Sequence, residues 1–182
     1  MSCALPLTDE TRVSTWTEKT SFPYAPPQAP HVGAFSMPLT RTPHWATREF
    51  HQFLLVRAKE PFIWGKNDCS LFAADAIRSF TGVDLADDFR GKYTDEASAM
   101  KVCKSVTGTA TIEAAAEWCA QKYGLAEWPT PLLAKRGDLV LVNESGRLIS
   151  AVIHLNGRHA VTVGEDGLKR LLVTSVVRAW AV

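Results

Sequence analysis

The first half of the chain places its hydrophobic residues at helical spacing. Four segments carry apolar side chains three or four residues apart, which is the repeat of an amphipathic helix. A Thr-Pro pair precedes the first segment and a glycine follows each of the others, as is usual at helix starts and ends. The pattern therefore predicts four helices, at about residues 43–60, 69–81, 95–107 and 112–123.

Beyond Pro131 the pattern changes to short runs rich in valine, isoleucine and leucine. Turn sequences separate these runs, and one of them, Asn156-Gly157, is the dipeptide most typical of a tight β-hairpin. We expect five strands, at residues 138–142, 148–155, 160–163, 168–173 and 176–182. Helices followed by an antiparallel meander define an α+β fold, with N-terminal helices packed on a C-terminal antiparallel sheet.

Residues 1–41 follow neither pattern. Five prolines between positions 23 and 38 interrupt them, and no helical or strand repeat persists, so we interpret them as an extended arm rather than a domain. The arm nevertheless carries aromatic side chains such as Trp16 and Tyr24, which a purely solvated linker does not need. It is either a free terminus or a segment that contacts partner proteins. The compact domain is expected over residues 42–182.

Composition narrows the classes of function. A chain of 182 residues that is 46% hydrophobic is long enough for one domain and a tail. Its 20 basic and 19 acidic residues give a net charge of +1, which offers no basis for binding nucleic acid or an anionic membrane. No apolar run reaches the ~18 residues of a membrane span, and the first residues lack the order of a secretory signal. We therefore expect the chain to stay in a cytosol or to travel within a larger particle.

The four cysteines, at positions 3, 69, 103 and 119, have neither metal-ligand spacing nor the density of a disulfide framework. They are predicted to be reduced, with Cys103 and Cys119 as core residues on helix faces. His44 and His51 could face the same way on the first helix, but a zinc site would need further ligands. No metal and no cofactor are predicted.

Cys69 is different because it begins the second predicted helix. The free N–H groups and positive dipole at a helix start favour a thiolate, so this thiol is a candidate nucleophile with a pKa below the usual ~8.5. The alternative is a packing thiol, since Cys69 also lies on the apolar stripe of the helix. Asp68 or Asn67 would cap this helix, and Trp64 would line a groove beside the thiol or pack in the core.

Two motifs in this order resemble the NlpC-type cell-wall cysteine peptidases. The run Trp64-Gly65-Lys66-Asn67-Asp68-Cys69-Ser70-Leu71-Phe72 is similar to their Asp-Cys-Ser nucleophile motif, and residues 136–142 are similar to their Gly-Asp first strand. Over residues 43–182 the chain more closely resembles phage and prophage proteins distantly related to those peptidases. That likeness rests on residues 61–65, 68–69, 81–84, 90–93 and 178–180.

The resemblance implies a papain-like fold in which Cys69 is the nucleophile and a strand histidine is its base. It places Asp68, Ser70 and Trp64 around the oxyanion and the substrate groove, and it implies acyl transfer on short peptidoglycan peptides, often after D-glutamate. The chain departs from that family at the base, because the alignment puts Ser150 at the position of the histidine. His154 and His159 are the candidate substitutes.

Two functions therefore remain open. One is a structural component of the phage tail tip, located in the virion, that keeps the peptidase fold and contacts other tail-tip proteins through its arm. The other is an active cysteine peptidase or amidase that opens peptidoglycan during DNA entry. The missing histidine favours the structural function, because a thiol without a base loses the ~10²–10⁴-fold contribution of general base catalysis.

Overall fold

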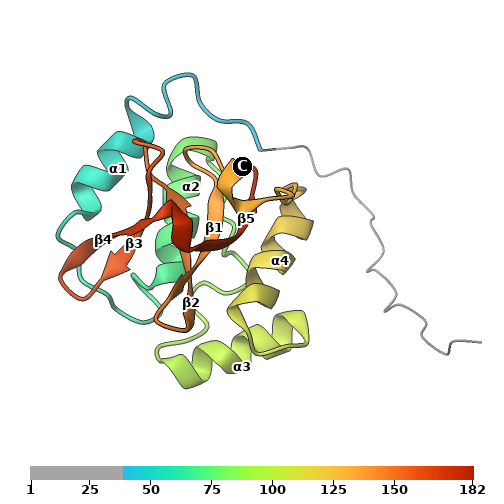
Figure 1. Ribbon diagram of the computed structural model, residues 1–182. Coiled ribbons are helices and arrows are strands. Elements are labelled where there is room, and N and C mark those ends of the chain that lie inside the picture. The colour runs from blue at the N-terminus through green and yellow to red at the C-terminus, as the bar shows by residue number, and fades with distance from the viewer. Residues whose placement is uncertain (1–38) are drawn as a thin grey trace, which may run out of the picture. The chain divides into compact units, whose positions relative to one another are not determined.

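The computed structural model describes residues 39–182, which form four helices and a five-stranded sheet (Figure 1). The helices come first in the chain and the strands follow, so the predicted α+β fold is confirmed. The predicted arm lies almost entirely outside the described residues. The helices are α1 (Glu49–Arg57), α2 (Cys69–Thr81), α3 (Glu96–Thr107) and α4 (Ile112–Tyr123).

The sheet is an antiparallel meander with β5 added beside β1. Its strand order is β4-β3-β2-β1-β5, and every neighbouring pair is antiparallel. Two short 3₁₀ turns, η1 (Pro131–Leu133) and η2 (Val173–Ser175), precede β1 and β5. The strands are β1 (Leu139–Glu144), β2 (Arg147–Ile153), β3 (His159–Gly164), β4 (Gly167–Leu172) and β5 (Val176–Trp180).

Helix ends agree well with the local sequence signals. Asp68, Asp95 and Thr111 cap α2, α3 and α4 through side-chain hydrogen bonds to backbone N–H groups. Gly82, Gly108 and Gly124 end these three helices, all in the left-handed conformation.

The start of the first helix was predicted wrongly. The Thr42-Pro43 pair does not begin α1, because residues 43–48 form turns and the helix starts at Glu49. The Thr42 N–H instead bonds the Phe80 carbonyl at the end of α2, and the Trp45 ring packs on Phe80 at 5.3 Å between centroids. Contacts with α2 therefore decide the course of this segment.

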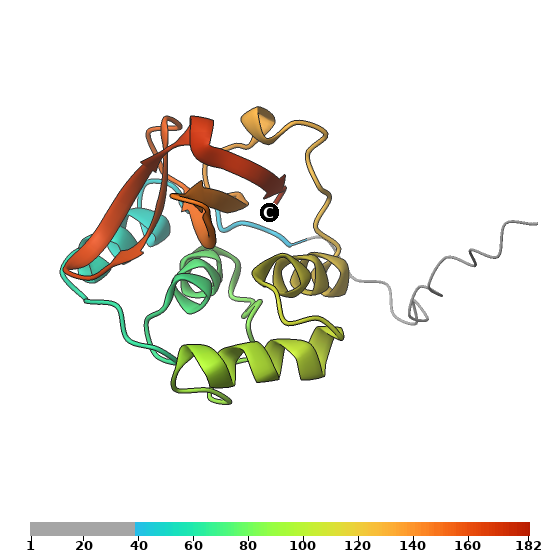
Figure 2. The same cartoon turned by 60° about the horizontal axis from the view of Figure 1, so that its bottom comes forward.

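Alternating residues of the strands divide the core into two clusters. Leu139 and Leu141 of β1 face the helices and join the larger cluster, which includes Phe50, Phe72 and Phe80. Val140 and Val142 point to the opposite face, where a smaller cluster is buried. Figure 2 shows α2 and α4 beside the sheet and α3 in an outer position beyond these two helices.

Candidate functional site

Asp68 fixes the start of the helix that carries Cys69. Its carboxylate is buried, and one oxygen accepts hydrogen bonds from the N–H groups of Ser70 and Leu71 at 3.1 and 3.0 Å. The other oxygen accepts from the Gly65 N–H at 3.0 Å and from the Tyr93 hydroxyl at 2.8 Å. Both oxygens of Asp68 are thus committed to holding the loop and the helix together, and Cys69 becomes the first residue of α2.

Tyr93 reaches Asp68 from the loop that joins α2 to α3. Burial and the neighbouring negative charge of Asp68 raise the pKa of the Tyr93 hydroxyl, which therefore stays protonated as a donor. Gly65 makes this contact possible, since it has a φ of +70° and a Cβ there would lie 2.0 Å from the Tyr93 carbonyl oxygen.

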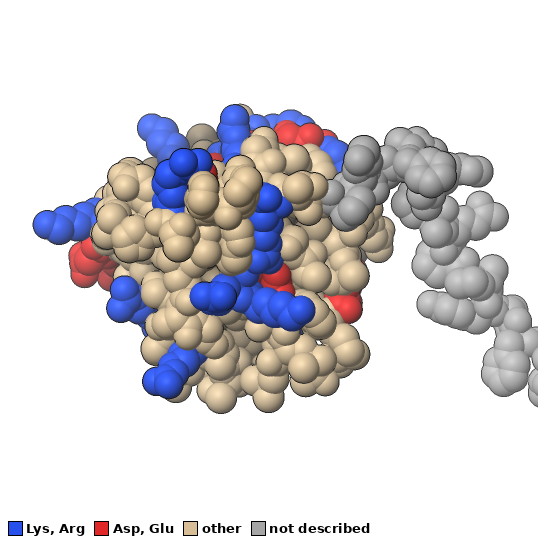
Figure 3. All heavy atoms as spheres, turned by 90° about the horizontal axis from the view of Figure 1, so that it is seen from above, with Lys and Arg blue, Asp and Glu red and all other residues tan. Residues whose placement is uncertain are grey.

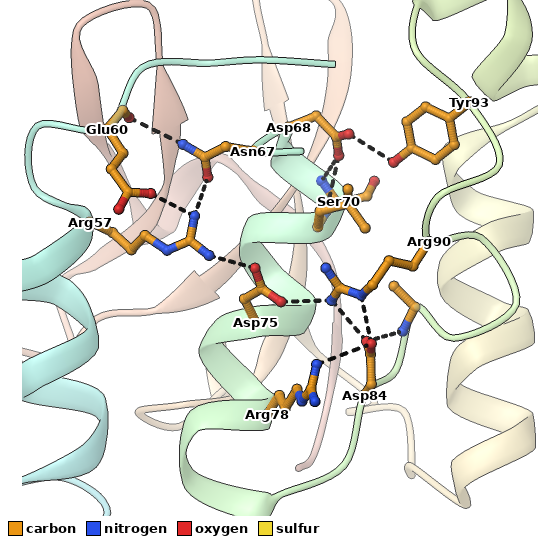
Figure 4. Close-up of polar contacts among 12 residues, drawn as sticks. Arg57, Glu60, Asn67, Asp68, Ser70, Asp75, Arg78, Asp84, Arg90 and Tyr93 are labelled. Carbon is orange, nitrogen blue, oxygen red and sulfur yellow. Dashed lines mark hydrogen bonds and ion pairs between the residues drawn. The ribbon is translucent and has the colours of Figure 1, made fainter. Parts of the chain in front are cut away.

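An ion-pair network holds the same loop against α1 and α2 (Figure 4). Asp75 of α2 accepts from Arg57 at the end of α1 and from Arg90 in the loop, both at 2.6 Å. Arg90 also donates to Asp84 at 2.6 Å. These partly buried pairs position the loop that carries Tyr93, so the network supports the site without facing the thiol.

Ser150 forms the wall opposite Cys69. It lies on β2, is 6% exposed, and its hydroxyl is 3.5 Å from the hydroxyl of Ser70. Its carbonyl accepts a hydrogen bond from the Thr162 hydroxyl at 2.8 Å. A serine hydroxyl has no basic nitrogen with which to take the thiol proton. The position where the resemblance calls for a histidine is thus occupied by a group that cannot be the base.

The environment of Cys69 opposes formation of a thiolate. The sulfur faces a cavity but is surrounded by protein on most sides, and this burial raises the pKa of the thiol. The charge of Asp68 raises the pKa further, while hydrogen bonds from the Ser150 backbone and from Ser70 lower it in part. The pKa lies above its ordinary value, contrary to the expectation from a helix start alone.

The two histidines proposed as substitutes for the base lie beside each other, and neither lines the cavity at Cys69. His154 follows β2 and His159 begins β3, and the His154 N–H bonds the His159 carbonyl at 2.8 Å. Asn156, in the turn between them, contacts an imidazole nitrogen of each, at 3.1 and 3.0 Å. Four residues of strand at ~3.3 Å each separate His154 from Ser150, which is about 13 Å.

A cavity of 680 Å³ extends from Cys69 between α2, α3, α4 and the β1–β2 hairpin. The predicted groove residues Trp64, Asp68 and Ser70 line it together with Cys69 and Ser150. Tyr93 also lines it, and the sequence did not indicate this residue. No histidine within residues 39–182 lines this cavity. The Trp64 ring also packs edge-on against Phe62, at 5.1 Å between centroids.

The other described cysteines have structural surroundings. The Cys103 thiol donates to the Thr111 carbonyl at 3.0 Å, and the Cys119 thiol donates to the Leu85 carbonyl at 3.1 Å. Burial and nearby aspartates raise the pKa of Cys119 to about 12. Within the described part of the chain, no three His, Cys, Asp or Glu side chains come close enough to hold a metal ion.

Asp138 of the Gly-Asp strand motif joins the two ends of the domain. Its buried carboxylate accepts from Arg41 at 2.7 Å, from the Trp128 indole at 2.8 Å and from the Lys135 N–H at 2.8 Å. The Val182 N–H adds a bond of 3.3 Å. The sequence showed this aspartate only as part of a strand motif, because its partners lie far apart along the chain.

On the face that Figure 3 draws, the charged side chains are spread out rather than gathered in one patch. Figure 3 shows lysine and arginine side chains at separate positions on one face, with uncharged surface between them. No helix among residues 39–182 is long and apolar enough to cross a membrane.

Comparison with known proteins identifies a family. A family model described as a domain of unknown function, DUF6950, matches residues 40–182. No curated protein and no solved structure matches the chain.

Proposed function

The chain belongs to the DUF6950 family, a domain of unknown function, and we propose that it is a structural component of a phage tail tip that keeps an NlpC-type peptidase architecture without its catalysis. Three features support the ancestry: helices that precede an antiparallel sheet, a cysteine at the first position of a helix, and a strand that begins after Gly137-Asp138. The tail-tip location rests on the resemblance to phage proteins.

The observation that carries the loss of catalysis is Ser150 on the wall facing Cys69. Thiol chemistry on a peptide carbonyl needs a group that removes the thiol proton and later protonates the leaving amine. Ser150 cannot do either, His154 and His159 lie at the far turn of the hairpin, and no histidine among residues 39–182 lines the cavity. The site therefore lacks the proton transfer that acyl transfer requires.

Asp68 is the nearest carboxylate to the thiol, and it is not a substitute base. Its two oxygens already accept four hydrogen bonds, from three backbone N–H groups and the Tyr93 hydroxyl. Its negative charge raises the pKa of Cys69 after the larger effect of burial. An aspartate in this position stabilises the helix start at the expense of thiol reactivity.

In this function the domain is a rigid module, and residues 1–41 supply contacts to neighbouring tail-tip proteins. The interior supports rigidity, since ion pairs tie α1, α2 and the α2–α3 loop together and Asp138 joins both ends of the domain. Such a module is suited to assembly in the host cytoplasm and to a fixed place in the virion.

Digestion of purified peptidoglycan tests the proposal. We expect the wild type and Cys69→Ala to release the same background of soluble peptides, because the thiol has no base. Cys119→Ala is the matched control, since it removes another thiol that lines the same cavity. Release by the wild type and by Cys119→Ala, but not by Cys69→Ala, would refute the structural function and establish the alternative, a cysteine peptidase acting during DNA entry.

Ser150→His provides the complementary test. An imidazole at this position would face the thiol and take its proton, so we expect Cys69 of this variant to react with iodoacetamide faster than the wild type at neutral pH. An unchanged rate would show that a histidine at position 150 does not act as a base for Cys69.

A further inference from the structure

The cavity beside Cys69 is larger than an inactive thiol requires. Its 680 Å³ falls within the range of small-molecule sites, about 300–1,000 Å³. It extends away from the thiol, under α3 and along α4. Residues of α2, α3 and α4 all line it, and Figure 2 shows α3 beyond α2 and α4 instead of against the sheet.

The long walls of the cavity are apolar. Side chains from several different elements line it between its inner end and its mouth: Leu71, Phe89, Met100, Ile112, Ala116 and Leu148. Burial of an apolar ligand against such walls is favourable by the hydrophobic effect.

Two hydroxyls at the inner end can each form a further hydrogen bond with a ligand. The hydroxyls of Ser70 and Ser150 are 3.5 Å apart, longer than the ~2.7–2.8 Å of a good O–H···O bond. Each can donate and accept, which suits a ligand hydroxyl or amide. Asp68 and Tyr93 are already bonded to each other at 2.8 Å and offer little to a ligand.

The mouth of the cavity disfavours anions. Three glutamates line the cavity together with Arg147, and because all four residues are exposed or half-buried we place them at its mouth: Glu96, Glu113 and Glu144. Arg147 pairs with Glu96 at 2.8 Å, and Glu144 pairs with Lys169. Glu113 has no ion pair within residues 39–182, so one negative charge at the mouth is not compensated.

We propose that this cavity binds a small apolar molecule that is uncharged or cationic and carries a hydroxyl or amide for the two serines. An anionic peptidoglycan peptide containing D-glutamate does not match the apolar walls or the acidic mouth. Binding in this cavity does not depend on reaction at Cys69 or on the tail-tip location. The experiments below therefore test it independently of both.

Two fluorescent probes with the same ring system test this proposal on the full chain. N-phenyl-1-naphthylamine is neutral, and 8-anilino-1-naphthalenesulfonate adds a negative charge. We expect the neutral probe to bind saturably and at least about threefold more tightly than the sulfonate, because of the charge at the mouth. Glu113→Gln should narrow this difference. Absence of saturable binding, tighter binding of the sulfonate, or an unchanged difference in Glu113→Gln would overturn the proposal.

A pair of substitutions on α3 locates the probe. Ala99 lines the cavity, whereas Ala97 is exposed on the same helix. We expect Ala99→Phe to fill the cavity and weaken binding of the neutral probe at least about tenfold, while Ala97→Phe binds like the wild type. Equal affinities in the two variants would place the probe elsewhere and overturn the proposal.

A measurement on the wild type tests the proposal even if Ala99→Phe does not fold. Saturating neutral probe should slow iodoacetamide labelling of Cys69, which lines the inner end of the cavity. An unchanged labelling rate would contradict occupation of this cavity.

Discussion

Asp68 links the stability of the domain to the reactivity of its thiol, and substitutions there should separate the two. In Asp68→Ala the cap of α2 is lost, at a cost of about 1 kcal/mol. The Gly65 N–H and the Tyr93 hydroxyl also lose their acceptor in a buried place, and each unpaired buried group costs about 1–3 kcal/mol. We expect the free energy of unfolding to fall by at least about 3 kcal/mol.

Asp68→Asn is the matched variant. Its amide oxygen can still accept from Ser70 and Leu71, and its NH₂ group can donate to the oxygen of Tyr93. Only the bond from Gly65 lacks a counterpart, so the expected loss is about 1 kcal/mol. Urea unfolding with linear extrapolation measures both values. Equal losses in the two variants would show that the helix cap and the bond to Tyr93 do not stabilise the domain.

Both substitutions remove the negative charge beside Cys69, which raises the pKa of the thiol in addition to burial. At pH 8 and without denaturant, iodoacetamide should therefore label Cys69 faster in both variants than in the wild type. Cys103 is the internal control, because it is buried and reports any general opening of the fold. Unchanged labelling of Cys69 would show that the charge of Asp68 does not control the thiol.

Three further predictions concern the frame of the site. Asp138→Ala removes the shared acceptor of the buried charge cluster and should cost about 2–4 kcal/mol in urea unfolding; a loss below about 1 kcal/mol would contradict its structural importance. Gly65→Ala should lower the melting temperature more than Gly91→Ala, since both glycines have a positive φ but only Gly65 approaches the Tyr93 backbone; equal shifts would contradict the close contact. Deletion of residues 1–38 should leave the melting temperature unchanged and abolish incorporation into phage particles, and normal incorporation would count against the arm as an assembly segment.

Features set by neighbouring residues could be predicted from the sequence. The caps at Asp68 and Thr111 depend on a few consecutive residues and form as expected. The expected hairpin connection also forms at Asn156-Gly157, but only Gly157 of the pair has a positive φ and the strands lie further apart along the chain than in a two-residue turn. The helix start at Thr42-Pro43 was wrong because a contact with Phe80, distant in the sequence, determines that segment.

The state of the site depended on distant contacts and could not be predicted. The rule for a helix start predicted a lowered pKa for Cys69, but burial under β2 and the charge of Asp68 raise it. Ser150 was located by the resemblance, whereas the backbone pairing of His154 with His159 across their turn needed the strand register. Tyr93 carried no local signal as a partner of Asp68, because 25 positions separate the two residues.

The pH dependence of Cys69 alkylation tests most directly whether the thiol is inactive. The wild type is labelled with iodoacetamide from neutral to alkaline pH, and the modification of Cys69 is followed by mass spectrometry. A buried thiol without a base should show a midpoint above the ~8.5 of a free cysteine, because burial and Asp68 both raise its pKa. A midpoint well below ~8.5 would mean that Cys69 is an activated nucleophile, and would contradict the proposed loss of catalysis.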